Sequence, residues 1–240
     1  MKTESLSYIE FKKLISQAKL QSDPIFCRLF LRPLSFPVGW LFYKSGVRAN
    51  TISLLSIFLT LYSSLLIGFG QRDDVILAAS LMLFVGLMDC IDGNVARARK
   101  ETGPSGEWMD AFSGYTVYAL LPVSLGLYLQ SNNQSETFSE IWIMIGAITS
   151  ISNLYLRLIY QKYISSFKEK IIINEFKGGG SLFSKFSSEM GLVGYMMPVF
   201  LICSVVNLLE IYLIFYCLFY SISVVVVAFV LVRKVNWSKN

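Results

Sequence analysis

Residues 75–110 read VILAASLMLFVGLMDCIDGNVARARKETGPSGEWMD. The apolar run that starts at Val75 leads directly into the acids Asp89 and Asp92. An apolar stretch of about 20 residues is long enough to cross a bilayer. Charges at membrane depth are costly and are kept mainly where they serve a function. This stretch therefore predicts a membrane helix with a functional site at one end.

Composition extends the membrane assignment to the whole chain. Of its 240 residues, 54% are hydrophobic and 15% are charged, whereas a soluble domain carries about 25% charged residues. The absence of histidine excludes Ser-His-Asp triads, Cys-His dyads and histidine-ligated zinc. No apolar h-region follows Met1, so we expect no cleavable signal peptide. The cysteines form no C-x-x-C pair and are expected to be small apolar core residues; they are Cys27, Cys90, Cys203 and Cys217.

Six apolar stretches are long enough to be membrane spans, because a span needs at least about 17 residues. They cover approximately residues 51–69, 75–96, 107–129, 138–160, 191–209 and 211–232. We therefore expect an all-α integral membrane protein, a six-transmembrane helical bundle. Its spans would form one domain over residues 49–235, followed by a cytoplasmic tail over residues 236–240.

The first 48 residues are expected to form a cytoplasmic or interfacial segment. Apolar residues recur there at helical spacing, opposite lysines, which is typical of an amphipathic helix on a membrane surface; they are Tyr8, Phe11, Leu14, Ile15 and Ala18. Residues 25–46 are also apolar, but arginines and prolines interrupt them, and the longest uncharged run is too short to span. An interfacial juxtamembrane segment is favoured there, with a re-entrant segment as the alternative.

Lysine and arginine are distributed unevenly between the segments that connect the spans. With the N-terminus in the cytoplasm, twenty of them lie on the cytoplasmic side and only Arg72 lies on the far side. Cytoplasmic segments of membrane proteins carry the excess of basic residues. The pattern predicts a multi-pass protein with both termini cytoplasmic and its active site at the cytoplasmic face. The net charge of +5 then reflects topology and contact with anionic lipid, and no nucleic-acid partner is expected.

The acids after the second apolar stretch form a pattern on helical surfaces. Asp89 and Asp92 are three residues apart and share one face of a helix. Asp110 opens the next span, with Gly106 and Gly114 one turn on either side of it. Three ionised carboxylates at one junction repel one another, and a divalent cation such as Mg²⁺, which favours carboxylate and phosphate oxygens, would offset that repulsion. A packing seam of small residues explains the glycines but not the acids.

These residues also match a known signature. The sequence resembles D-x-x-D-G-x-x-A-R-x(8)-G-x-x-x-D-x-x-x-D of the membrane-embedded CDP-alcohol phosphotransferases at every position but the last, in Asp89, Asp92, Gly93, Ala96, Arg97, Gly106 and Asp110. The resemblance implies a transferase that moves the alcohol-phosphate group of a CDP-alcohol to a lipid or polar acceptor and releases CMP. It also implies a homodimer.

The resemblance assigns roles to individual residues. It implies that Asp89, Asp92 and Asp110 are catalytic and hold Mg²⁺ or Mn²⁺ on the CDP diphosphate, with Arg97 beside a phosphate. Gly93, Ala96 and Gly106 would allow close approach of the substrate. Asn50 and Ser53 resemble part of the P-N-x-x-T motif that the family has near the nucleotide. Asn50 is also explained as a helix N-cap.

Arg157 lies near the cytoplasmic end of the fourth expected span. It is a candidate substrate-binding residue, as an anion site for an acceptor phosphate or a lipid headgroup. The alternative is an arginine whose long side chain reaches back to the interface.

Gly114 stands where the signature has its last aspartate, the residue expected to act as general base on the acceptor. Three outcomes are open: an acceptor that is already anionic, a substitute such as Glu107 or Ser113, or a family member that binds CDP-alcohol without turnover. A transporter or membrane scaffold with a buried carboxylate site is a further alternative. A transporter favours charges on several spans and repeat symmetry, and this chain has neither.

Overall fold

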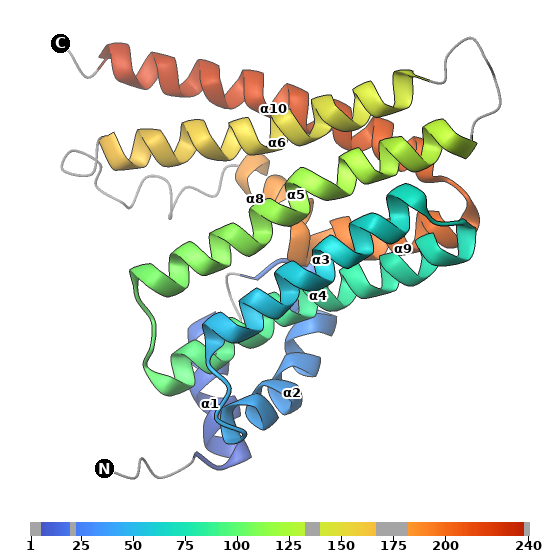
Figure 1. The fold of residues 1–240 in the computed structure, drawn as a ribbon. Coiled ribbons are helices and arrows are strands. Elements are labelled where there is room, and N and C mark those ends of the chain that lie inside the picture. Colours follow the sequence, from blue (N-terminus) through green and yellow to red (C-terminus); the bar gives the residue numbers. More distant parts are fainter. Residues whose placement is uncertain (1–5, 20–22, 133–139, 167–181, 238–240) are drawn as a thin grey trace.

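The computed structural model describes residues 6–19, 23–132, 140–166 and 182–237, and every regular element within these ranges is a helix (Figure 1). The elements in chain order are α1 (Tyr8–Lys19), η1 (Cys27–Leu31), α2 (Arg32–Lys44), α3 (Ala49–Phe69), α4 (Arg72–Arg99), α5 (Pro104–Asn132), α6 (Ile141–Ser166), α8 (Leu182–Glu189), η2 (Leu192–Met196), α9 (Met197–Val206) and α10 (Leu209–Trp237). Residues 167–181, half of the connection between the fourth and fifth expected spans, lie outside the described residues.

Six helical segments are long and apolar enough to cross a membrane, which confirms the predicted fold class. They are Ala49–Phe69, Arg72–Arg99, Pro104–Asn132, Ile141–Ser166, Phe186–Val206 and Leu209–Arg233. The second of them continues to Arg99, so both Asp89 and Arg97 lie on one unbroken helix. The helix ends at Lys100, which adopts the left-handed conformation with φ of 58°.

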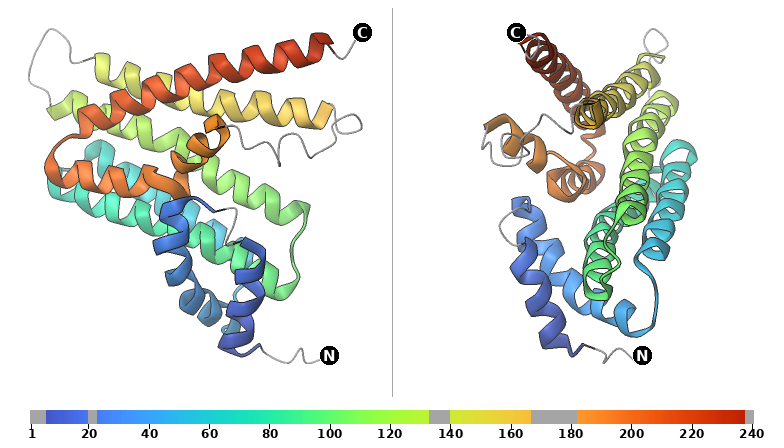
Figure 2. Two further views of the ribbon diagram at one scale, coloured as in Figure 1. Left: turned by 180° about the vertical axis from the view of Figure 1, so that it is seen from behind. Right: turned by 90° about the vertical axis from the view of Figure 1, so that its left-hand side faces the viewer.

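The long helices lie alongside one another and alternate in direction (Figures 1 and 2). α3 packs on α4 and α5, α5 packs on α6, and α6 packs on α10, while α9 covers part of α4. The C-terminal ends of α4, α6 and α10 lie at the same end of the bundle as the start of α5 (Figure 1). The connection between α4 and α5 is therefore at the end of the bundle where α1 and α2 pack against α4.

The main apolar core lies between five helices. Side chains that are fully buried or nearly so come from α3, α4, α5, α9 and α10, for example Ile67, Met82, Leu121, Phe200 and Leu213. Large apolar side chains also cover much of the outer surface of the bundle, such as Phe58 and Val225. Outward-facing apolar side chains suit helices whose surroundings are lipid rather than water.

The fifth apolar segment differs from the single span that its composition predicts. α8 ends at Glu189, and a π-helical turn, η2, leads into α9, with a kink at Gly194 (φ −88°, ψ −130°). A Cβ at Gly194 would lie 2.1 Å from the carbonyl oxygen of Glu189. The break therefore depends on glycine, because the chain passes too close to its own backbone for a side chain.

The amphipathic N-terminal helix is present as α1, and part of its apolar face packs on α2. Phe11 and Ile15 are completely buried against Phe36 of α2 and the neighbouring aromatic residues Trp40 and Tyr43. Tyr8 and Leu14 of the same predicted face are exposed, and the position of α1 on a membrane surface stays a prediction. Residues 25–46 form η1 and α2, which pack against α4 rather than crossing the bundle.

Close backbone contact joins α5 to α6. A Cβ at Gly126 would lie 2.6 Å from the carbonyl oxygen of Trp142, and one at Gly146 would lie 2.4 Å from that of Pro122. Small residues commonly permit this approach between membrane helices. The two glycines therefore fix how closely α6, and with it α10, can pack on the rest of the bundle.

Replacing Gly146 with Ala should destabilise the protein, because the added methyl group would overlap backbone that cannot move independently. We expect a loss of about 1–3 kcal/mol, the usual cost of overpacking, measured as a lower midpoint of thermal unfolding in detergent. Gly114→Ala is the matched control, since a Cβ there would meet nothing closer than Tyr118 at 3.9 Å. Equal midpoints for the two variants would contradict the close contact.

Candidate active site

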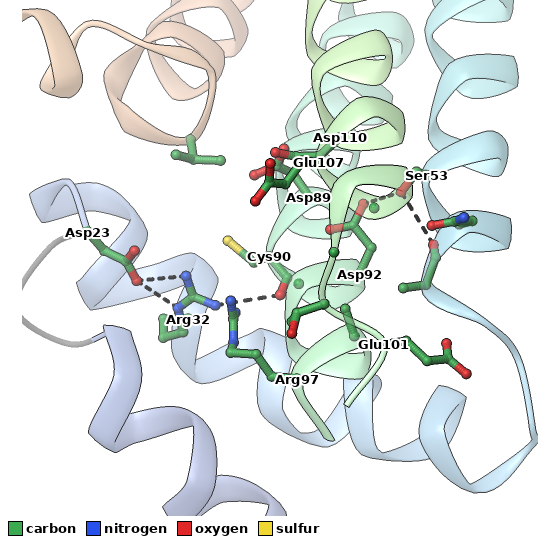
Figure 3. Close-up of a pocket in the computed structure, with 18 of the residues that line it drawn as sticks. Asp23, Arg32, Ser53, Asp89, Cys90, Asp92, Arg97, Glu101, Glu107 and Asp110 are labelled. Atoms are coloured by element: carbon green, nitrogen blue, oxygen red, sulfur yellow. Dashed lines mark hydrogen bonds and ion pairs between the residues drawn. The ribbon is translucent and has the colours of Figure 1, made fainter. Parts of the chain in front are cut away.

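A cavity of about 410 Å³ lies where the C-terminal part of α4 meets the starts of α3 and α5 (Figure 3). Its lining includes nearly every residue that the sequence singles out, namely Asn50, Ser53, Asp89, Asp92, Gly93, Ala96, Arg97, Gly106 and Asp110. Helical periodicity explains why α4 contributes most of these residues. Residues three, four, seven and eight positions after Asp89 lie on the same face of a helix, and these are Asp92, Gly93, Ala96 and Arg97.

The three aspartates approach one another across two helices. Asp89 on α4 and Asp110 on α5 are immediate neighbours, with Glu107 beside them, and Asp92 acts on Asp89 electrostatically (Figure 3). Arg32 forms an ion pair with Asp23, at 2.7 Å. Within the described residues, none of the carboxylates of Asp89, Asp92 and Asp110 forms an ion pair with a lysine or arginine, although Arg97 is near enough to act on Asp92 electrostatically.

A hydroxyl group fixes the most buried of these carboxylates. Ser53 of α3 donates a hydrogen bond to Asp92 Oδ2 at 2.6 Å, and Asp92 is only 6% exposed. Ser53 thus connects α3 to the face of α4 that borders the cavity.

Asn50 does not cap its helix. α3 begins at Ala49 with Arg48 at the N-cap position and no side-chain cap, so the N-cap interpretation of Asn50 was wrong. Asn50 instead donates a hydrogen bond to Ser105 Oγ of α5 at 3.3 Å. This contact connects the two helix starts that border the cavity.

The structure also adds residues that the motif did not indicate. The N-terminal segment supplies Asp23, Cys27 and Arg32 to the cavity wall, and Val193 reaches it from the fifth span. The sequence held one signal for them, since Arg32 interrupts an apolar stretch and a charge in such a place needs a partner.

Cys27 and Cys90 are buried next to each other, with their sulfur atoms 3.4 Å apart, and both border the cavity. The prediction of small buried cysteines holds for this pair, while Cys203 and Cys217 are only partly buried.

A family model of the CDP-alcohol phosphatidyltransferases matches residues 47–177, more than half of the chain. The chain belongs to the CDP-alcohol phosphatidyltransferase family. Its members are membrane transferases that move a phosphoalcohol group from a CDP-alcohol to an alcohol acceptor, and they use divalent metal ions. A search of curated proteins found no match. The matched range includes all three aspartates and Arg97, but it begins after the N-terminal residues of the cavity wall.

The donor chemistry of the cavity suits the divalent ion that the family uses. Carboxylate oxygens are preferred Mg²⁺ ligands, and Mg²⁺ commonly takes one or two carboxylates together with substrate phosphates. Among the described residues no three acidic or cysteine side chains make a ligand set on their own. The aspartates therefore fit an open site that a bound diphosphate completes.

Two residues of interest lie away from this cavity. Arg157 of α6 donates to Asn153 Oδ1 at 2.9 Å and stacks on the ring of Tyr118, 3.8 Å from its centre. Gly114 also faces Tyr118, since a Cβ there would lie 3.9 Å from that ring. Neither residue borders the cavity, so the structure brings Arg157 close to Tyr118 and Gly114 rather than to the aspartates.

Proposed function

We propose that this protein transfers the alcohol-phosphate group of a CDP-alcohol to an acceptor and releases CMP. One observation carries the proposal: a single cavity in a member of this family holds Asp89, Asp92 and Arg97 of α4 together with Asp110 of α5. The acceptor is a lipid or a smaller polar molecule, and both can reach a site at the end of a membrane bundle. The homodimer that the family implies stays a prediction.

In the proposed reaction an oxygen of the acceptor attacks the β-phosphorus of the CDP-alcohol. The bond between that phosphorus and the oxygen that bridges it to the α-phosphorus breaks, and CMP leaves with the bonding electrons. If the attacking oxygen carries a proton, a base or solvent must accept it. Positioning and charge stabilisation then account for most of the catalysis, as in other phosphoryl transfers.

The residues of the cavity suit the donor side of this reaction. Arg97 is always charged and presents several N–H donors to a phosphate oxygen. Gly93 leaves room for the guanidinium group of Arg97, and Ala96 keeps the α4 surface low beside Asp92, so a diphosphate can approach both the guanidinium group and the helix. A divalent ion held by aspartates of this cluster together with the diphosphate would neutralise charge on the diphosphate and on the departing CMP.

The general base is the part of the mechanism that this chain has changed. Gly114 has no carboxylate, and Ser113 is buried in a hydrogen bond with Ser56 at 2.6 Å. Glu107 borders the cavity and is exposed, so it is the better substitute of the two candidates. General base catalysis contributes about 10²–10⁴-fold, so turnover does not depend on it entirely when metal and positioning remain.

An acceptor with an anionic oxygen fits these residues better than a neutral alcohol does. Such a nucleophile needs no general base, and a glycine at position 114 spares it repulsion by a carboxylate. Arg157 stacks on Tyr118, the same ring that position 114 faces, and supplies a cation instead. We therefore favour a phosphate or a similar anionic group as the acceptor nucleophile.

Metal dependence is the first test. Asp89→Asn should weaken binding of a CDP-alcohol at least about tenfold, a change of about 1.4 kcal/mol, because a neutral amide cannot offset the charge of Mg²⁺. The measurement is nucleotide affinity and CMP release by purified protein with Mg²⁺, Mn²⁺ or EDTA. Asp73→Asn, an exposed aspartate at the other end of α4, is the control. Nucleotide affinity that EDTA leaves unchanged would disprove the metal site.

Gly114→Asp tests the identity of the acceptor. The variant should lose turnover with a phosphate-bearing acceptor, because a new carboxylate repels it, while its affinity for the CDP-alcohol stays the same. Gly114→Asn controls for side-chain size, and CMP release is measured with both acceptor types. If Gly114→Asp instead speeds the reaction of a neutral alcohol and leaves the anionic acceptor unaffected, then the site merely lost its base.

The basic residues predict that the cavity faces the cytoplasm. In a background without native cysteines, Ser45→Cys should react with a membrane-impermeant maleimide only after cells are permeabilised. Asp73→Cys, at the opposite end of the bundle, should react in intact cells. Both positions are exposed. The reverse labelling pattern would place the cavity on the outside, away from cytoplasmic nucleotides.

A further inference from the structure

The N-terminal segment forms part of the cavity wall although it precedes the matched family range. Arg32 is only 4% exposed, and its Nε and Nη2 atoms lie 2.8 Å and 2.7 Å from Asp23 Oδ2. Its remaining terminal nitrogen, Nη1, donates to Asn94 Oδ1 at 2.8 Å. The buried charge of Arg32 is thus paired with Asp23. Asp23 and Asn94 together fix the position of the guanidinium group.

Asn94 occupies a position that the family signature leaves free. It is completely buried, and its Nδ2 donates to Ser35 Oγ at 2.9 Å. Its Oδ1 accepts hydrogen bonds from Arg32 and from Arg97 Nη2, the latter at 3.2 Å. Only one orientation of the amide satisfies all these contacts, because the reverse orientation would point its N–H groups at two guanidinium groups.

Arg97 is therefore held between Asn94 and the backbone of its own helix. Its Nη2 atom lies 3.1 Å from the place where a Cβ of Gly93 would be, so the guanidinium rests over this glycine at the cavity wall. Its Nε is buried without a hydrogen-bond partner. Since Asp23 is already paired with Arg32, Arg97 has no ion-pair partner within the described residues. Such a cation suits an incoming anion.

We propose that Asn94 is a positioning residue for Arg97. Its amide oxygen, fixed by Ser35 and Arg32, holds the Arg97 guanidinium at the cavity wall, where it meets the diphosphate of the nucleotide. This inference rests on the proposed function for the identity of the anion. It assigns to the N-terminal segment a role in nucleotide affinity, because Arg32 and Ser35 fix the side chain that fixes Arg97.

The test measures affinity for CDP with Mg²⁺, using the full-length protein in detergent and isothermal titration calorimetry. Asn94→Leu should weaken CDP binding about tenfold, which corresponds to about 1.4 kcal/mol, and should leave binding of cytidine, which lacks phosphate, unchanged. In an Arg97→Ala background the same substitution should have no further effect on CDP affinity, because the side chain that it positions is gone.

Asn153→Leu is the matched control. Asn153 is also completely buried and also presents its Oδ1 to an arginine, Arg157, but it lies outside the cavity. Its substitution should leave CDP affinity unchanged. Ser35→Ala provides a milder variant in case Asn94→Leu does not fold. It removes the acceptor of the Asn94 amide and should weaken CDP binding in the same direction, and again only when Arg97 is present.

The outcomes separate this inference from the proposed reaction. An equal loss of CDP affinity from Asn94→Leu with and without Arg97 would show that Asn94 acts only through the fold, and would overturn the inference. Unchanged CDP affinity in Asn94→Leu, or in Ser35→Ala if that variant alone folds, would also overturn it. Coupling between Asn94 and Arg97 without CMP release from any CDP-alcohol would support the inference and overturn the transfer. A wild-type protein that does not bind CDP would overturn both.

Discussion

Mutual repulsion among Asp89, Asp92 and Asp110 is the constraint on which the rest of the site depends. The three carboxylates meet where two apolar helices end, and charges interact more strongly there than in water because the local dielectric constant is lower. No lysine or arginine of the described chain forms an ion pair with them. The protein supports Asp92 with a neutral hydroxyl of Ser53 instead. The carboxylates therefore have no ion-pair partner within the described residues, and a divalent cation can take that place.

The positive charges of the cavity are kept apart from Asp89 and Asp110. Figure 3 shows Asp89 and Asp110 together on one side of the cavity, with Arg32 and Arg97 on the other. Asp23 neutralises Arg32 within the N-terminal segment, and this arrangement leaves Arg97 for the substrate. An acidic wall next to a basic one suits a metal–diphosphate group, because such a group carries a cation at one place and anionic oxygens nearby. The separation of an acidic and a basic wall thus depends on the ion pair between Arg32 and Asp23, two residues that lie outside the signature.

The sequence predicted the spans and the aspartate cluster because both depend on local patterns. Apolar length determines a span, and the three-residue spacing of Asp89 and Asp92 places them on one helical face whatever the tertiary structure. The N-terminal wall could not be predicted in this way. Arg32 meets Asn94 across 62 positions of the chain, and no periodicity encodes that contact. Likewise, the amphipathic pattern of α1 indicated an apolar partner without showing that α2 provides part of it.

Gly114 and Arg157 have to be considered together, because both lie next to Tyr118. The ring of Tyr118 carries the Arg157 guanidinium at 3.8 Å, and its edge lies 3.9 Å from where a Cβ of residue 114 would be. Its hydroxyl also accepts a hydrogen bond from the backbone N–H of Leu192, next to the break in the fifth span. With glycine at position 114, the ring of Tyr118 has a cation on Arg157 but no carboxylate from residue 114 beside it. Both features agree with the anionic acceptor that we propose.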